Sequence, residues 1–200
     1  MEGASTSDPV ARTLIPVLVH EVNNTTQLLV GLRALLDLPG GEELFSKRAD
    51  ELARASQQMD DLGFALAVLA TANGANMLLA RRNRRAVEIL WSLAVRSLER
   101  SGEARVSCEG APPSVAPSAL DGWQAPWSAA ALLLTASEHC GVETWRWRWG
   151  DDGALVGRSG GSGELAADAI DAIASRVPGA TIESRAGEVE WRLPDAWLER

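Results

Sequence analysis

The fold is decided by residues 14–41, which read LIPVLVHEVNNTTQLLVGLRALLDLPGG. Apolar side chains recur in this stretch at spacings of three and four residues, the pattern of one buried face of an α-helix. That face comprises Leu14, Leu18, Thr25, Leu28, Leu32 and Leu36, with the threonine in place of an apolar residue. Asp8-Pro9 upstream supplies a helix start, and Pro39-Gly40-Gly41 supplies a stop. The sequence therefore predicts one long helix that ends near Leu38.

The next segment, residues 42–73, repeats this pattern and ends before Gly74. Its apolar positions are Phe45, Leu52, Met59, Leu62, Leu66 and Leu69. Each helix has about 30 residues and a length of about 45 Å, so the two helices form an extended hairpin. A hairpin of this length buries one stripe per helix and leaves other apolar surface uncovered. We expect two hairpins to pair as a four-helix bundle in a homodimer. Folding of the second half of the chain back on the hairpin is the alternative cover.

The pattern changes after Arg85, where a second domain is expected to begin. Apolar periodicity predicts helices over residues 86–99, 127–139 and about 164–176. Alternation and turn residues predict strands over residues 142–149, 154–158, 180–184 and 188–193, with a further short strand within 102–117. The chain is thus predicted to be a helical hairpin over residues 1–80 followed by an α+β sandwich over residues 81–200. In this sandwich, helices cover one face of a mostly antiparallel sheet.

Composition and charge exclude several classes of protein. The net charge of −8 argues against nucleic acid as the main partner, because phosphate contacts require a surplus of Lys and Arg. The most apolar stretch, residues 62–80, is interrupted by asparagines and a glycine, so no membrane span is expected. With two cysteines and no secretory pattern at the N-terminus, a cytoplasmic protein with reduced thiols is expected. The basic run at residues 81–85 is expected to be a solvated linker, with a lipid or phosphate site as the alternative.

Residues 20–24, His-Glu-Val-Asn-Asn, carry the chemistry that is easiest to recognise. Helical spacing places His20 and Asn24 away from the leucine stripe, where the imidazole meets solvent. Glu21 is positioned to hydrogen-bond the imidazole and keep one ring nitrogen nucleophilic, and Asn24 to steady a phosphoryl group or an attacking water. The zinc-protease motif is excluded because Asn24 stands where a second histidine is needed. A plain surface histidine is the simpler alternative.

This pentapeptide resembles the phosphoacceptor box of sensor histidine kinases, His-Glu-x-x-Asn, which lies on the first helix of a dimerising hairpin. The second half is similar to the ATP-binding domain of the same kinases, but with losses. Thr135 stands where the family has the asparagine that reaches magnesium and phosphate, within Leu132-Leu133-Leu134-Thr135-Ala136. Ser159 stands where the family has the adenine-reading aspartate, before the glycines of residues 160–163. The lid of some twenty to thirty residues is missing, since Gly163 is followed directly by Glu164.

This layout resembles the dimeric histidine phosphotransferases of the ChpT type. The resemblance implies that His20 takes a phosphoryl group from the aspartate of one response-regulator receiver domain and passes it to another, with Glu21 and Asn24 assisting. It implies no bound cofactor, since the receiver supplies the magnesium ion. Two alternatives stay open: a non-catalytic pseudokinase that acts as a scaffold or inhibitor, and a working kinase with an atypical nucleotide site.

Tryptophans alternate with arginines over residues 144–149, Thr-Trp-Arg-Trp-Arg-Trp. On a strand this alternation places Trp145, Trp147 and Trp149 on one face and Arg146 and Arg148 on the other. The tryptophans are expected either to pack in the core or to form an exposed docking face.

Overall fold

The computed structural model describes residues 9–75, 85–101, 105–110, 112, 124–139, 144–150, 152, 154–159, 167–174, 181–185 and 188–192. Its helices are α1 (Pro9–Ala34), the 3₁₀ helix η1 (Leu35–Asp37), α2 (Gly41–Ser46), α3 (Ala49–Ala72), α4 (Ala86–Ser101), α5 (Gln124–His139) and α6 (Ala167–Ala174). Its strands are β1 (Arg105–Glu109), β2 (Thr144–Trp149), β3 (Ala154–Ser159), β4 (Thr181–Arg185) and β5 (Glu188–Arg192). Residues 81–84 of the expected linker and the domain boundary at residue 80 lie outside these ranges.

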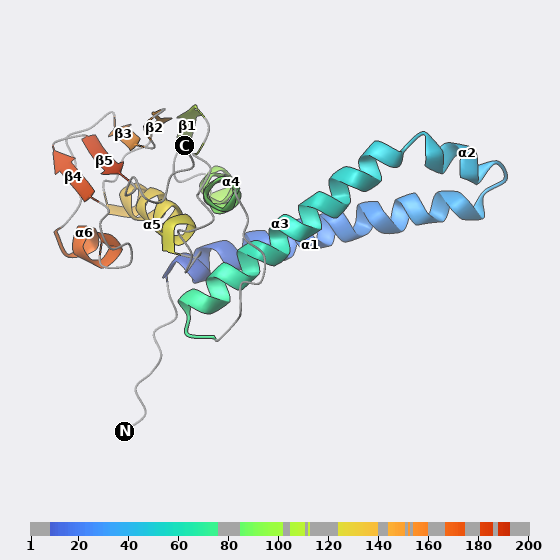
Figure 1. The fold of residues 1–200 in the computed structure, drawn as a ribbon, viewed down its shortest axis with the longest axis horizontal. Helices are drawn as coiled ribbons and strands as arrows, with labels where there is room; N and C mark the ends of the chain where they lie inside the picture. Colours follow the sequence, from blue (N-terminus) through green and yellow to red (C-terminus); the bar gives the residue numbers. More distant parts are fainter. Residues whose placement is uncertain are drawn as a thin grey trace, which may run out of the picture.

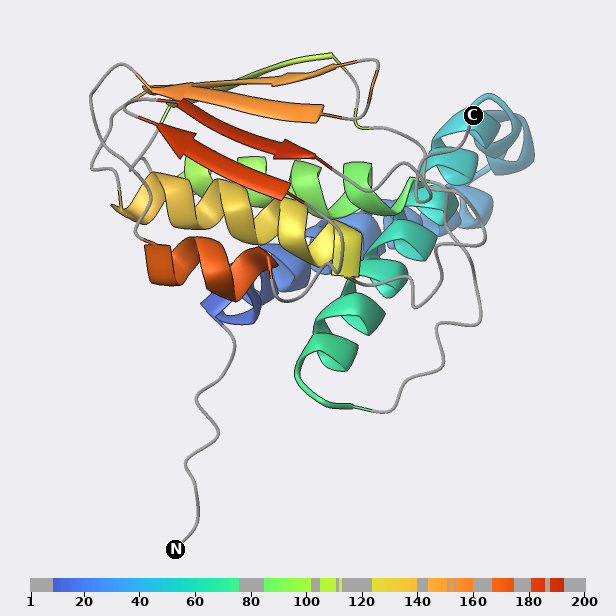
Figure 2. The same cartoon turned by 60° about the vertical axis from the view of Figure 1, so that its left-hand side comes forward.

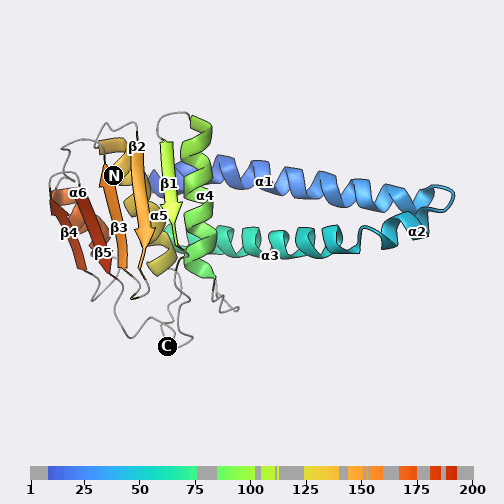
Figure 3. The same ribbon diagram turned by 90° about the horizontal axis from the view of Figure 1, so that it is seen from above.

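The helical hairpin is present, with α1 and α3 packed side by side as a rod that projects from the rest of the molecule (Figures 1 and 3). Within the predicted stripe of α1, Leu14, Leu18 and Leu32 are buried. Thr25 is buried too, because its hydroxyl donates a hydrogen bond of 2.9 Å to the carbonyl oxygen of Glu21 one turn earlier. A threonine therefore occupies an apolar stripe without leaving a polar group unpaired.

The second predicted helix differs from the structure, which divides it into α2 and α3 at Lys47 and Arg48. The chain first reverses at Gly40, whose φ of +73° is a conformation that favours glycine. The short α2 then packs against η1 and closes the tip of the hairpin, while α3 turns to follow α1. No large apolar side chain lies between Phe45 and Leu52, so the break in the helix removes no large apolar residue from the core.

The second half forms a five-stranded sheet with strand order β1-β2-β3-β5-β4. β1 runs parallel to β2, and the other neighbours are antiparallel. Figure 2 shows the sheet as one layer, with α4 and α5 as a second layer beneath it and the hairpin beyond them. The predicted combination of a helical hairpin with an α+β region is confirmed.

Tryptophans fill the space between the sheet and the helices. Trp147, Trp149 and Trp191 are buried, as is Trp91 of α4. The ring of Trp91 meets those of Trp147 and Trp149 edge-on, with ring centroids 5.6 Å and 5.5 Å apart. Trp147 and Trp149 are therefore core residues rather than a docking face, whereas the side chain of Trp145 lies outside the described part of the chain.

The base of the hairpin shares this core. Leu14 of α1 and Leu69 of α3 belong to one continuous cluster with Leu90 of α4 and Leu133 of α5. The second half of the chain therefore covers the base of the hairpin, as in the alternative given above. The distal part of the hairpin extends away from it (Figure 3). Large apolar side chains left exposed are Ile15, Val19, Leu28, Val30, Leu36, Leu38, Leu44 and Leu66. Three of these residues belong to the apolar stripes predicted to be buried: Leu28, Leu36 and Leu66. Their side chains are exposed to solvent in the single chain.

Gly157 tests the packing of the tryptophan core. A Cβ atom at this position of β3 would lie 2.5–2.7 Å from ring atoms of Trp147, whereas a Cβ at Gly63 of α3 would meet nothing within 4 Å. Gly157→Ala is expected to lower the free energy of unfolding by about 1–3 kcal/mol through overpacking. Gly63→Ala should raise it by about 0.5–1 kcal/mol, because alanine is the better helix former. Denaturant unfolding measures both, and equal stability of Gly157→Ala and the parent would mean that Trp147 does not pack here.

Candidate phosphoacceptor site and adjoining pocket

His20 lies near the middle of α1 with its side chain exposed. Asn24 follows one turn later and is exposed as well. Positions four residues apart share one face of a helix, so the imidazole and the amide lie on the same solvent-facing surface. The solvent-facing positions of His20 and Asn24 are those that helical spacing predicted.

Glu21 points in a different direction, because each residue turns the helix by about 100°. Its side chain is only 9% exposed, and it receives three contacts from two other helices. Arg96 and Arg100 of α4 approach the two carboxylate oxygens at 3.0 Å and 2.9 Å. The amide of Gln58, on α3, donates a third bond of 3.2 Å. Glu21 therefore ties together α1, α3 and α4.

The expected hydrogen bond between Glu21 and the imidazole has no counterpart in this arrangement. In the part of the chain that the structure describes, the partners of the Glu21 carboxylate are Arg96, Arg100 and Gln58, and His20 is not among them. The interactions of Glu21 are therefore structural: together with buried apolar residues such as Leu14 and Leu18, its carboxylate holds the inward face of α1 against the other helices.

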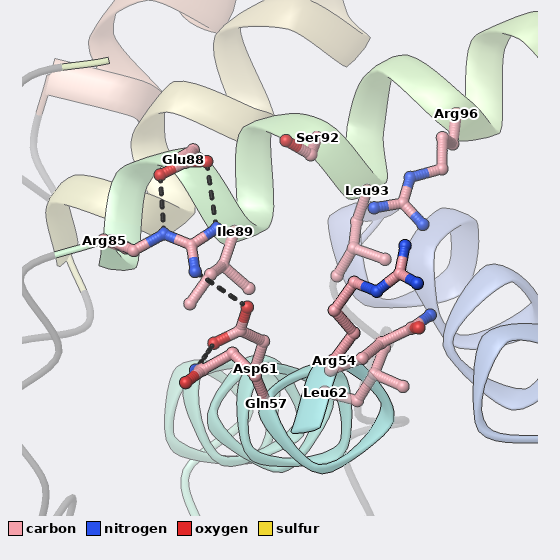
Figure 4. Close-up of a pocket in the computed structure, with 11 residues that line it drawn as sticks. Arg54, Gln57, Asp61, Leu62, Arg85, Glu88, Ile89, Ser92, Leu93 and Arg96 are labelled. Carbon is pink, nitrogen blue, oxygen red and sulfur yellow. Dashed lines mark hydrogen bonds and ion pairs between the residues drawn. The ribbon is translucent and has the colours of Figure 1, made fainter. Parts of the chain in front are cut away.

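A pocket of about 220 Å³ adjoins this cluster between α3 and α4, and is called here the α3–α4 pocket. Figure 4 shows its lining. The floor is apolar and consists of Leu62, Ile89 and Leu93, which are all buried. At one end the guanidinium groups of Arg54 and Arg96 point toward one another.

The opposite end of the pocket is an internally paired network. Arg85 donates two hydrogen bonds to Glu88, at 2.8 Å and 3.0 Å, and reaches Asp61 at 3.4 Å. The hydrogen bonds from Arg85 hold the pKa of the Glu88 carboxyl below its ordinary value, against a smaller opposing effect of burial. Gln57 donates a further bond of 2.9 Å to Asp61. These carboxylates therefore already have partners.

The structure adds three residues to the site that were not predicted from the sequence: Gln58, Arg96 and Arg100. Arg96 and Arg100 are four residues apart on α4, which places them on one face of an amphipathic helix. That spacing is a local signal of a polar face. It does not reveal that the face meets a buried carboxylate 75 and 79 residues earlier in the chain, since 96 − 21 = 75 and 100 − 21 = 79.

The positions compared with the nucleotide site of the kinases are only partly described. Ser159 ends β3, and its backbone pairs with Trp145 of β2. The side chain of Thr135 and residues 160–166 lie outside the described part. Among the residues that the structure describes, no three His, Cys, Asp or Glu side chains gather as a metal site, and no helix is long and apolar enough to cross a membrane.

Comparison with known proteins adds no relative. No protein-family model matches the sequence, and no curated protein matches it. What the chain does is therefore inferred from its own residues.

The contribution of the Glu21 carboxylate to the stability of the fold can be measured by replacing it with a neutral side chain. Glu21→Gln removes a charge from a buried site and weakens its bonds to Arg96 and Arg100, so the free energy of unfolding should fall by about 1–3 kcal/mol. Glu43→Gln is the matched control, because Glu43 pairs with Lys47 on the surface, with 77% and 66% of the two side chains exposed. Glu43→Gln should change the free energy of unfolding by no more than about 0.5 kcal/mol. A Glu21 variant as stable as the control would contradict the anchoring role.

Proposed function

We propose that this chain is a histidine phosphotransferase of a two-component phosphorelay, with His20 as the residue that carries the phosphoryl group. The observation that supports this most is the exposed His20 on a helix whose inward face carries the buried Glu21. A histidine in this position reaches a partner protein without any movement of the second half of the chain.

The reaction needs a nucleophile and good positioning. A lone pair of the neutral His20 imidazole attacks the phosphorus of an aspartyl phosphate on a receiver domain. A phosphorus–nitrogen bond forms, the phosphorus–oxygen bond breaks, and the aspartate leaves as a carboxylate. The reverse step transfers the group to a second receiver. Asn24 would donate a hydrogen bond to a phosphoryl oxygen, and the receiver would hold the magnesium ion that supplies charge neutralisation there.

The second half of the chain supports transfer rather than autophosphorylation. Residues 160–166, seven in all, separate the end of β3 from the start of α6, so this connection is too short for the lid that the kinases carry. The aspartate and asparagine that those kinases use for adenine and magnesium are serine and threonine, at Ser159 and Thr135. We infer that the α+β region is a degenerate relative of the kinase domain that does not use ATP.

We propose a homodimer because apolar side chains remain on the face of the hairpin turned away from α4. On α1, Val19 lies about 200° around the helix from Glu21, which contacts α4. On α3, Leu66 lies about 140° from Asp61, which also faces α4. Val19 and Leu66 are 54% and 56% exposed in the single chain. A second hairpin on this face would cover them and complete a four-helix bundle.

One observation favours the alternative of a non-catalytic scaffold. Within the described residues, the carboxylate of Glu21 bonds to Arg96, Arg100 and Gln58 and not to His20, so the expected assistance from Glu21 is not seen. A receiver domain binding to the same exposed face without phosphoryl transfer would fit that arrangement.

Transfer of labelled phosphate tests the proposal. The full chain is mixed with each phosphorylated receiver domain of the host and magnesium, and acid-labile, base-stable label should appear on the chain. His20→Ala should abolish the label while the circular dichroism spectrum is unchanged, because the side chain is exposed. His139→Ala, at the only other histidine, should retain it.

The same assay separates the alternatives. Receiver binding without label on the parent chain would identify a scaffold. Label from ATP alone, with no receiver present, would identify a working kinase. Equal label on His20→Ala and the parent would remove His20 from the mechanism.

The dimer is tested by sedimentation of the full chain. Leu66→Glu places a charge in the proposed interface and should shift the chain from dimer to monomer at micromolar concentration, because an unpaired buried carboxylate costs several kcal/mol. Ala53→Glu adds the same charge to an exposed position of α3 about 140° around the helix from Leu66, and it should leave the dimer intact. A parent chain that sediments as a monomer would contradict the four-helix bundle.

A further inference from the structure

The basic end of the α3–α4 pocket brings two positive charges together, of which Arg96 is paired with Glu21 and Arg54 has no carboxylate partner among the described residues. Arg54 comes from α3 and Arg96 from α4, and their guanidinium groups point toward one another in Figure 4. Both side chains are exposed. Two like charges that converge on a pocket repel each other. An anion bound between them attracts both and offsets that repulsion.

The hydrogen-bonding capacity of this pair is only partly used. Within the described residues, Arg54 donates one long bond of 3.3 Å from Nε to the carbonyl oxygen of Asp50, and no carboxylate pairs with it. Arg96 contacts Glu21, whose carboxylate is already shared with Arg100. Because Arg96 shares the single charge of Glu21 with Arg100 and Arg54 has no carboxylate partner, the end of the pocket lined by Arg54 and Arg96 keeps a net positive charge.

The acidic residues of the pocket do not neutralise this end. Asp61 and Glu88 lie at the opposite end, where Arg85 is paired with both of them. Between the two ends the pocket has the apolar floor formed by Leu62, Ile89 and Leu93. The pocket therefore offers a basic site for an anionic group and apolar surface for what is attached to it.

We propose that the α3–α4 pocket binds the phosphate group of a small phosphorylated molecule between Arg54 and Arg96. A phosphate monoester carries close to two negative charges at neutral pH, which suits the net positive charge at this end of the pocket. Guanidinium groups bind phosphate oxygens in pairs through parallel N–H bonds, and the free edges of Arg54 and Arg96 can supply such pairs. The floor accommodates the organic part of the ligand.

The position of this site makes it a link between the two halves of the chain. Arg54 belongs to the hairpin and Arg96 to the first helix of the second half, so a phosphate held by both joins the halves beside the Glu21 contact. This site is separate from phosphoryl transfer, because His20 does not line the pocket.

Thermal unfolding of the full chain tests the proposal, with inorganic phosphate and phenyl phosphate as probes and sodium chloride at equal ionic strength as the reference. At ten times the dissociation constant, each probe should raise the melting temperature by about 3–6 °C. Phenyl phosphate should bind more tightly than inorganic phosphate, because its ring covers the apolar floor. Arg54→Gln should weaken phosphate binding at least tenfold, since it removes a charge-assisted pair of hydrogen bonds.

Two matched variants separate this site from other effects. Arg48→Gln removes an exposed arginine of the same region that is paired with Glu51 and should bind phosphate like the parent. His20→Ala should also bind like the parent, so failure of phosphoryl transfer and failure of this site are distinguishable. Equal responses of Arg54→Gln and the parent would overturn the proposal. Stabilisation by acetate as strong as that by phosphate would overturn the assignment to a phosphate group.

Discussion

The buried carboxylate of Glu21 is the interaction on which the arrangement of the helices depends. Burying a charge costs several kcal/mol unless it is paired, and Arg96, Arg100 and Gln58 together offset that cost. These partners come from α3 and α4, so the same carboxylate that α1 must bury also sets how α3 and α4 lie against it. Successive residues point about 100° apart on a helix, so His20 points in a different direction from the inward Glu21, and its side chain is exposed.

This constraint relates the proposed chemistry to the fold. Phosphoryl transfer between aspartate and histidine needs little from the carrier beyond an accessible nucleophile in a fixed place. The hairpin supplies it: its base is buried against α4 and α5, its middle presents His20, and its far end projects into solvent (Figure 3). Arg96 contributes both to the Glu21 contact and to the lining of the α3–α4 pocket.

The sequence predicted the elements well because their signals are local. Three-and-four spacing located the helices, and alternation between residues 144 and 149 located a strand whose Trp147 and Trp149 are in the core. The break at Lys47 and Arg48 was missed, because helix propensity continues through it and the cause is the packing of α2 on η1. Such tertiary packing leaves no local mark in the sequence.

The candidate site was predicted only in part, for a related reason. The outward position of His20 and Asn24 follows from helical geometry alone. The partners of Glu21 do not, because Arg96 and Arg100 become its neighbours only when α4 packs on the hairpin. The same holds for Leu66, which fits a buried stripe by spacing but lies on the side of α3 that a single chain leaves open.

Phosphorus NMR of the full chain tests the central claim, that His20 is a phosphoryl carrier, most directly. The spectrum is recorded after the chain is mixed with a phosphorylated receiver domain and magnesium. The account predicts one new phosphoramidate resonance that is absent in His20→Ala and decays when a second receiver is added. Receivers that bind the chain and lose their phosphate only to water, with no such resonance, would contradict it.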